Sequence, residues 1–213
     1  MNLIRMDSWR ALLPHSLKEP GEITSAFARA GVYDYRAAAR YVSHLAYGRN
    51  NESSNAMVVL SEQRGTCSTK HALLRRLAFE QQLPVKLMLG IFEMSGKNTP
   101  RVGAVLEKYR LQYLPEAHCY LRANGHRIDA TRDFDGELVA VTLDFLYEQD
   151  ISAEQIGSYK TSVHQQFLSR WLAQSGAGRG RSLDEIWKIL TKARSKRRNL
   201  VPKTKAEVYA AKD

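Results

Sequence analysis

An Asn-Gly pair at positions 124 and 125 constrains the fold of this chain more than any other feature. It separates two short runs in "AHCYLRANGHRIDAT" (117–131), and Asn-Gly is the strongest short-range signal for a two-residue β-hairpin turn. A turn of two residues fixes the register of the hairpin, so Leu121 is expected to pair with Ile128. The sequence therefore predicts two antiparallel strands whose facing residues can be assigned by counting from the turn.

The same counting assigns side chains to the two faces of the hairpin, because they alternate along a strand. His118 and Tyr120 share one face, and Asp129, opposite Tyr120, lies on it as well. His118 and Asp129 are then diagonal neighbours with Cα atoms roughly 7–8 Å apart, within reach of an imidazole–carboxylate hydrogen bond. Cys119 falls on the opposite face among apolar residues and is expected to be a buried core thiol.

The other cysteine, Cys67, stands at the start of a predicted helix, "CSTKHALLRRLAFEQQ" (67–82), which ends before Pro84. Backbone dipoles at a helix N-terminus favour a thiolate and lower the pKa of a thiol. Cys67 is therefore the candidate nucleophile. His118 would act as its base and Asp129 would orient the imidazole, while backbone N–H groups at the start of the helix could form an oxyanion site.

Three further residues are weaker candidates for the same site. Gln63 could donate its side-chain amide to an oxyanion, and Tyr120 could contact substrate from the face of His118. His71 is a rival base, because residues one helical turn apart meet and it lies four positions after Cys67. It could equally be a polar flank of the site or partly exposed. The alternative to catalysis is that these are ordinary residues of a small α+β core.

The order and spacing of these residues resemble the motif of the transglutaminase-like superfamily, and the chain is similar to its bacterial-type members. The resemblance covers about residues 60–135 and rests on motif elements that follow one another in the expected order and spacing. They are Gly65 and Cys67 at a helix start, Leu83-Pro84-Val85 before a strand, His118 with an aromatic residue two positions on, and Asp129 followed by Thr131.

The resemblance implies a papain-like α+β fold and a Cys67–His118–Asp129 triad that attacks an amide through a thioester. Family members include cross-linking transglutaminases, amide hydrolases, peptidases and members that have lost activity, so a protein or peptide substrate is expected. Two positions depart from the family pattern. Tyr120 stands where tryptophan is frequent, and Gln82 stands where a glycine usually precedes the Leu-Pro step.

The predicted elements run from helices through strands to helices again, an order typical of an α+β fold. Residues 85–94 are expected to form a buried strand, residues 95–116 a loop that selects substrate, and the chain after "RDFDGE" to be helical. Further helices are expected at 22–30, 33–47, 152–174 and 183–198. The expected divisions are a helical flank (1–55), a core with its following helix (56–174), a linker (175–182) and a basic helix and tail (183–213).

The positive charge of the chain is concentrated near its C-terminus. The formal net charge is +10, and residues 179–213 hold eleven Lys or Arg against four Asp or Glu. Residues 179–205 could therefore bind nucleic acid or another anionic surface. The alternative is a helix that docks on the domain by its apolar side and leaves its charged side in water. An inactive interaction protein that works through this basic region is a further alternative.

Other classes of site are not indicated. "DATRDFDGE" (129–137) resembles part of a calcium loop, but the remaining ligands are not in register, so we expect no metal and no cofactor. No apolar run reaches the roughly 18 residues of a membrane span. Two cysteines and an N-terminus without a signal-like apolar segment favour free thiols and a cytoplasmic location. The oligomeric state is left open.

Overall fold

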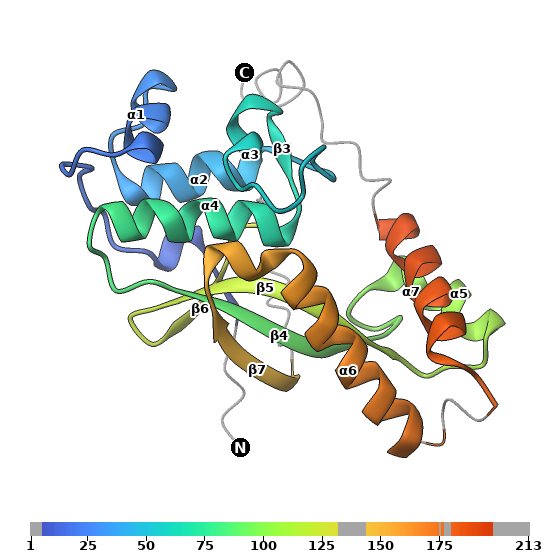
Figure 1. The fold of residues 1–213 in the computed structure, drawn as a ribbon. Helices are drawn as coiled ribbons and strands as arrows, with labels where there is room; N and C mark the ends of the chain where they lie inside the picture. The colour runs from blue at the N-terminus through green and yellow to red at the C-terminus, as the bar shows by residue number, and fades with distance from the viewer. Residues whose placement is uncertain (1–5, 132–143, 175, 177–179, 198–213) are drawn as a thin grey trace, which may run out of the picture.

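The computed structural model describes residues 6–131, 144–174, 176 and 180–197, and it shows a mixed α and β chain (Figure 1). Within these residues the larger sheet has five strands in the order β1-β6-β5-β4-β7. β1 is parallel to β6, and the other neighbours are antiparallel. The strands are β1 (Met6–Ser8), β4 (Lys86–Met94), β5 (Leu114–Ala123), β6 (His126–Asp129) and β7 (Phe145–Ile151), and a small separate sheet pairs β2 (Ala46–Tyr47) with β3 (Arg64–Gly65).

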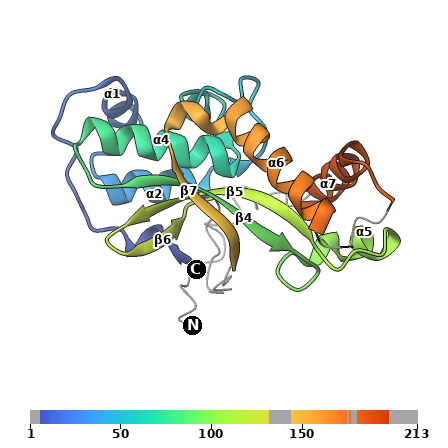
Figure 2. The same ribbon diagram turned by 60° about the horizontal axis from the view of Figure 1, so that its bottom comes forward.

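Most of the helices lie on one side of the larger sheet. Figure 2 shows α1, α2, α4 and α6 above it, with α5 and α7 beyond its end. The helices are α1 (Glu22–Arg29), α2 (Tyr35–His44), α3 (Val58–Ser61), α4 (Cys67–Glu80), α5 (Gly103–Lys108), α6 (Ser158–Gln174) and α7 (Leu183–Arg197), with short 3-10 turns η1 (Trp9–Ala11), η2 (Pro100–Val102) and η3 (Ala153–Ile156).

The hairpin has the register that its turn predicts. Leu121 pairs with Ile128, and Asn124 and Gly125 have φ angles of 51° and 79°, as a two-residue primed turn requires. Cys119 is fully buried in the core on the α4 side, together with Leu121 and Ile128. The predicted division of the hairpin into two faces is therefore confirmed, and so is the prediction that Cys119 is a core thiol.

Local sequence explains where α4 begins. The Thr66 side chain accepts the backbone N–H of Thr69, and the Thr69 hydroxyl accepts the N–H of Thr66, which is a capping box. Gly65 is needed before the cap, because a Cβ there would lie 2.9 Å from both the Lys70 Cγ and the Thr69 Oγ1. The Gly-x-Cys spacing thus sets the N-terminus of the helix at Cys67.

Local sequence also explains where α4 ends. Gln82 has a φ of 54°, in the left-handed region that favours glycine. Its N–H bonds the carbonyl of Phe79, and the N–H of Leu83 bonds the carbonyl of Ala78, which is the Schellman arrangement. This position, at which the motif that the chain resembles usually has glycine, therefore has a glycine-like backbone even though it carries glutamine.

Two regions differ from the sequence-based expectation. Residues 145–151, expected to be helical, form β7, and that prediction is wrong because β4 offers an edge with which this short run pairs. The expected loop 95–116 contains η2, α5 and the first residues of β5. The helices predicted at 22–30, 33–47, 67–82, 152–174 and 183–198 are found as α1, α2, α4, η3 with α6, and α7, and the strand predicted at 85–94 is found as β4.

The C-terminal helix is packed into the domain. Ile186, Leu190 and Ala193 of α7 are fully buried in a second core cluster with side chains of α5, α6, β4 and β5. This matches the alternative in which the basic helix docks by its apolar side. None of the helices in the described part of the chain is long and apolar enough to cross a membrane.

Candidate active site

Cys67 lies at the first turn of α4, next to the free edge of β5. β5 pairs with β6 only from Leu121 to Ala123, so the preceding residues of β5 have no strand on that side within the described chain. The Cys67 thiol lies close enough to the His118 side chain and to the backbone N–H of Cys119 for both to lower its pKa. The end of the helix and the strand edge thus bring the predicted nucleophile to the predicted base.

His118 is held by Asp129 from the neighbouring strand. The His118 Nε2 lies 2.9 Å from the Asp129 Oδ2, and the other carboxylate oxygen accepts the backbone N–H of Thr131 at 2.7 Å. Because Nε2 faces the carboxylate, Nδ1 is the ring nitrogen left to face the thiol. The predicted contact between His118 and Asp129 is confirmed, and the three residues form a connected Cys–His–Asp arrangement.

The charges of these three groups reinforce one another. Burial by itself would raise the pKa of the Cys67 thiol, but Lys160 and His118 lower it well below its ordinary value. Burial by itself would lower the pKa of His118, but Asp129 and Cys67 raise it to about 10. Burial would raise the pKa of Asp129, yet His118 keeps it well below the usual range. Both shifts favour a thiolate–imidazolium pair over a neutral thiol and imidazole.

His71 lies within the scaffold of the site and is completely buried. Its Nδ1 lies 2.8 Å from the backbone carbonyl of Cys67, and its Nε2 accepts the backbone N–H of Ala130 at 2.7 Å. Burial lowers the pKa of His71, and this keeps the ring neutral. Both ring nitrogens join the start of α4 to the end of β6, so His71 positions the two elements and is not partly exposed.

Lys70 makes a second buried connection between the same elements. It has no exposed surface, and its Nζ donates to the backbone carbonyls of Leu45 at 2.6 Å and Thr131 at 2.8 Å. Thr131 lies two positions after Asp129 in the chain, so Lys70 fixes the backbone next to the carboxylate. The "Cys-Ser-Thr-Lys-His" run therefore supplies the nucleophile together with two side chains that hold its partner strand.

The other two weaker candidates, Gln63 and Tyr120, direct their side chains away from Cys67. The side-chain amide of the exposed Gln63 donates to the carbonyl of Leu60 and the hydroxyl of Tyr41, so both of its donors are engaged away from Cys67. Tyr120 is buried on the face of the sheet opposite α4, where its ring stacks on Phe145 and its hydroxyl bonds a glutamate of β7. The geometry gives neither residue a place at the thiol.

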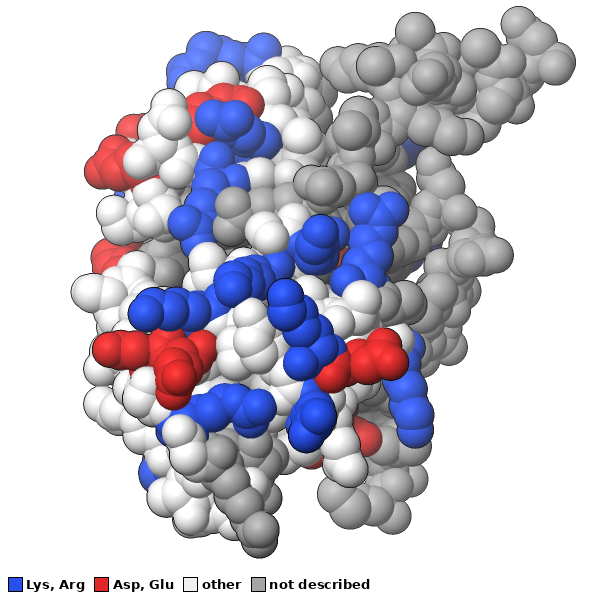
Figure 3. Space-filling view, turned by 90° about the vertical axis from the view of Figure 1, so that its right-hand side faces the viewer, with Lys and Arg blue, Asp and Glu red and all other residues white. Residues whose placement is uncertain are grey.

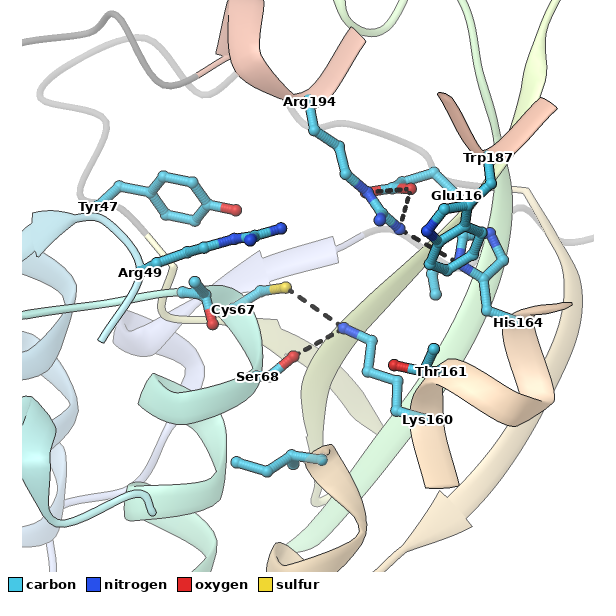
Figure 4. Close-up of a pocket in the computed structure, with 13 residues that line it drawn as sticks. Tyr47, Arg49, Cys67, Ser68, Glu116, Lys160, Thr161, His164, Trp187 and Arg194 are labelled. Atoms are coloured by element: carbon cyan, nitrogen blue, oxygen red, sulfur yellow. Dashed lines mark hydrogen bonds and ion pairs between the residues drawn. The ribbon is translucent and has the colours of Figure 1, made fainter. Parts of the chain in front are cut away.

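A cleft opens beside Cys67, between the start of α4 and the helices α6 and α7 (Figure 4). Lys160 of α6 reaches into it, with its Nζ 3.9 Å from the Cys67 sulfur and 2.7 Å from the Ser68 hydroxyl. Burial by itself would lower its pKa, but Cys119, Cys67 and Glu116 together raise it to about 12, so it stays charged. The cleft lining comprises Tyr47, Arg49, Thr66, Cys67, Ser68, Glu116, Ala117, Ile156, Lys160, Thr161, His164, Trp187 and Arg194.

The far wall of the cleft is a buried polar cluster that the sequence did not reveal. Arg194 forms a two-pronged ion pair with Glu116, with contacts from 2.9 to 3.1 Å. It also donates to the Nδ1 of His164, whose Nε2 bonds the carbonyl of Pro115. Burial lowers the pKa of His164 to about 4, so its ring is neutral. These residues come from three separate elements, and no local pattern links them.

Comparison with known proteins leaves the family open. No family model matches the chain, and searches of curated proteins and of solved structures found no match. Among the described residues, no cluster of three or more His, Cys, Asp or Glu side chains could hold a metal ion. Most of the calcium-loop-like stretch 129–137 lies outside the described residues.

Proposed function

We propose that this protein carries out cysteine-dependent acyl chemistry on an amide, as a transglutaminase-like enzyme with a papain-like arrangement of helix and sheet. The observation that carries the proposal is the Cys67 thiol next to the hydrogen-bonded His118–Asp129 pair, beside an open cleft. A thiolate at a helix start, an imidazolium and an orienting carboxylate are the groups that this chemistry needs. Because the chemistry needs reduced thiols, we place it in the cytoplasm.

The reaction would proceed in two balanced steps. In the first, the Cys67 sulfur bonds to the acyl carbon and the carbon–nitrogen bond breaks, while His118 gives its proton to the leaving nitrogen. In the second, water or an amine loses a proton to His118 and attacks the thioester, which releases the acyl product and restores the thiolate. Asp129 would hold the ring and stabilise its charged form in both steps.

Two groups beside the sulfur could stabilise the negative charge that develops on the acyl oxygen. One is the backbone N–H of Cys119, which already points at the sulfur, and the other is the ammonium of Lys160 at 3.9 Å. A preorganised donor of this kind typically accounts for about 10²–10³ in rate. Neither was foreseen, because the oxyanion site was expected from backbone N–H groups at the start of the helix, with Gln63 as a weaker side-chain candidate.

The test is a screen of glutamine-containing peptides for ammonia release and for amine incorporation, with the native chain and Cys67→Ala. We expect Cys67→Ala to abolish the activity while its circular dichroism spectrum stays native-like. The control is Cys119→Ala, which removes the other thiol, keeps its backbone N–H and should retain activity. An active Cys67→Ala variant would end the proposed mechanism.

A second candidate is binding of an anionic partner such as nucleic acid by the face that carries α7. Figure 3 shows more Lys and Arg than Asp and Glu among the described residues of this face. Lys188, Lys192 and Lys196 are exposed on α7, so they can be changed together to Gln without opening the core. The nucleic-acid hypothesis predicts binding that weakens steeply with salt and is lost in this triple variant. Binding that the triple variant retains would contradict it.

A further inference from the structure

The cleft beside Cys67 is lined by three cationic side chains from three different elements. Arg49 comes from the segment after β2, Lys160 from α6 and Arg194 from α7. Figure 4 shows Arg49 extending toward the cleft on the Cys67 side and Arg194 on the opposite side. The carboxylate among the lining residues is Glu116. The cleft is thus built to hold negative charge next to the nucleophile.

The three cations are not equally available to a ligand. The guanidinium of Arg194 donates to the Glu116 carboxylate through two of its nitrogens. Its Cζ lies 5.2 Å from the centroid of the Trp187 ring. Lys160 is engaged by the Ser68 hydroxyl and the Cys67 sulfur. Arg49 is exposed, and within the described residues no hydrogen bond or ion pair occupies its guanidinium. Arg49 is therefore the cation that an incoming anion can meet.

Resting on the proposed function, we propose that the acyl donor carries a carboxylate close to its scissile carbonyl, and that Arg49 binds this carboxylate while Lys160 faces it from across the cleft. The planar guanidinium presents paired donors that match the two oxygens of a carboxylate. A neutral amide would leave Arg49 without a partner, so binding energy would favour the acidic substrate.

The surrounding surface supports the same preference. On the face that carries α7 beside the cleft, Lys and Arg outnumber Asp and Glu among the described residues (Figure 3). A surface of one sign next to a cleft raises the local concentration of ligands of the opposite sign, and salt weakens the effect. An acidic substrate would therefore be favoured both on approach and when bound.

Two thiol reagents of nearly equal size separate charge preference from turnover. Iodoacetate is anionic and iodoacetamide is neutral, and each loses iodide as it alkylates a thiolate. The measurement is the rate of Cys67 modification by each reagent, read by mass spectrometry, with the ratio of the two rates divided by the same ratio for free cysteine. We expect iodoacetate to be favoured in the native chain and the normalised ratio to fall about threefold to tenfold in Arg49→Gln.

Two variants serve as controls. Arg49→Lys keeps the charge and should keep most of the preference. Arg29→Gln removes an exposed arginine from α1 and should keep all of it. A ratio that Arg49→Gln leaves unchanged, or that Arg29→Gln lowers equally, overturns the substrate class while Cys67 chemistry stands. If Cys67 reacts with neither reagent faster than Cys119 does, the proposed function fails and the substrate class fails with it.

Discussion

Replacing Lys160 by methionine tests whether the cleft itself makes Cys67 a thiolate. The substitution removes a positive charge 3.9 Å from the sulfur and keeps a side chain of similar length. Two unit charges at this distance attract by about 1 kcal/mol in water-like surroundings and by about 4 kcal/mol at an effective permittivity of about 20. Because Lys160 is partly buried, the effect should lie between these limits.

The charges decide the direction of the change. Lys160 stabilises the thiolate and not the thiol, so its loss raises the pKa of Cys67 and shifts the acid limb of the alkylation profile to higher pH. On that limb the rate follows the thiolate fraction, and each 1.4 kcal/mol corresponds to about a factor of ten. We therefore expect the rate at a fixed acidic pH to fall at least about fivefold in Lys160→Met.

The assay is iodoacetamide modification of Cys67 from acidic to neutral pH, with folding checked by circular dichroism at each point. Lys160→Arg keeps the charge and should follow the native profile closely. Lys86→Met removes a lysine from an exposed ion pair with Asp150 on the far strand and should leave the profile unchanged. If the acid limbs of Lys160→Met and the native chain coincide, the electrostatic account of Cys67 is refuted.

Two further predictions concern the scaffold of the site. Lys70→Met should lower the free energy of unfolding by about 2–4 kcal/mol, because buried carbonyls such as those of Leu45 and Thr131 lose a charged donor. In urea titrations Lys86→Met should lower the free energy of unfolding by less than about 1 kcal/mol. Equal losses of unfolding free energy in the two variants would contradict the structural role of Lys70. Gln82→Gly should raise the unfolding free energy by up to about 1 kcal/mol, because it relieves the left-handed strain at the end of α4. A lower urea midpoint for Gln82→Gly would argue against that strain.

The parts of the site that sequence could predict are those that local rules determine. The Asn-Gly turn fixes the hairpin register, and the register places His118 and Asp129 on one face without any knowledge of the rest of the fold. Thr66 and Gly65 fix the start of α4, so the position of Cys67 at the helix end also follows from neighbouring residues. The catalytic roles of a thiol, a base and an orienting carboxylate suggested that the two elements meet, and the resemblance to a known family implied the same triad.

The parts that sequence could not predict depend on contacts between distant segments. Lys160 is 93 positions from Cys67, and Arg194 is 78 positions from Glu116. Helical periodicity identifies α6 and α7 as amphipathic, but it does not say which polar residue will face a cleft. Likewise β7 was missed, because a short run becomes a strand only when an edge such as that of β4 is available.

The thiolate at Cys67 shows how the two levels combine. From sequence, the helix N-terminus was the reason to expect a lowered thiol pKa, and that argument needs only α4. In the folded chain Lys160, His118 and the N–H of Cys119 act on the same sulfur from α6 and β5. Arg49 is not part of this set, so the charge that activates the nucleophile and the charge that selects the substrate lie on different residues. Lys160→Met should therefore alter the pH profile with a neutral reagent, whereas Arg49→Gln should alter the preference between reagents.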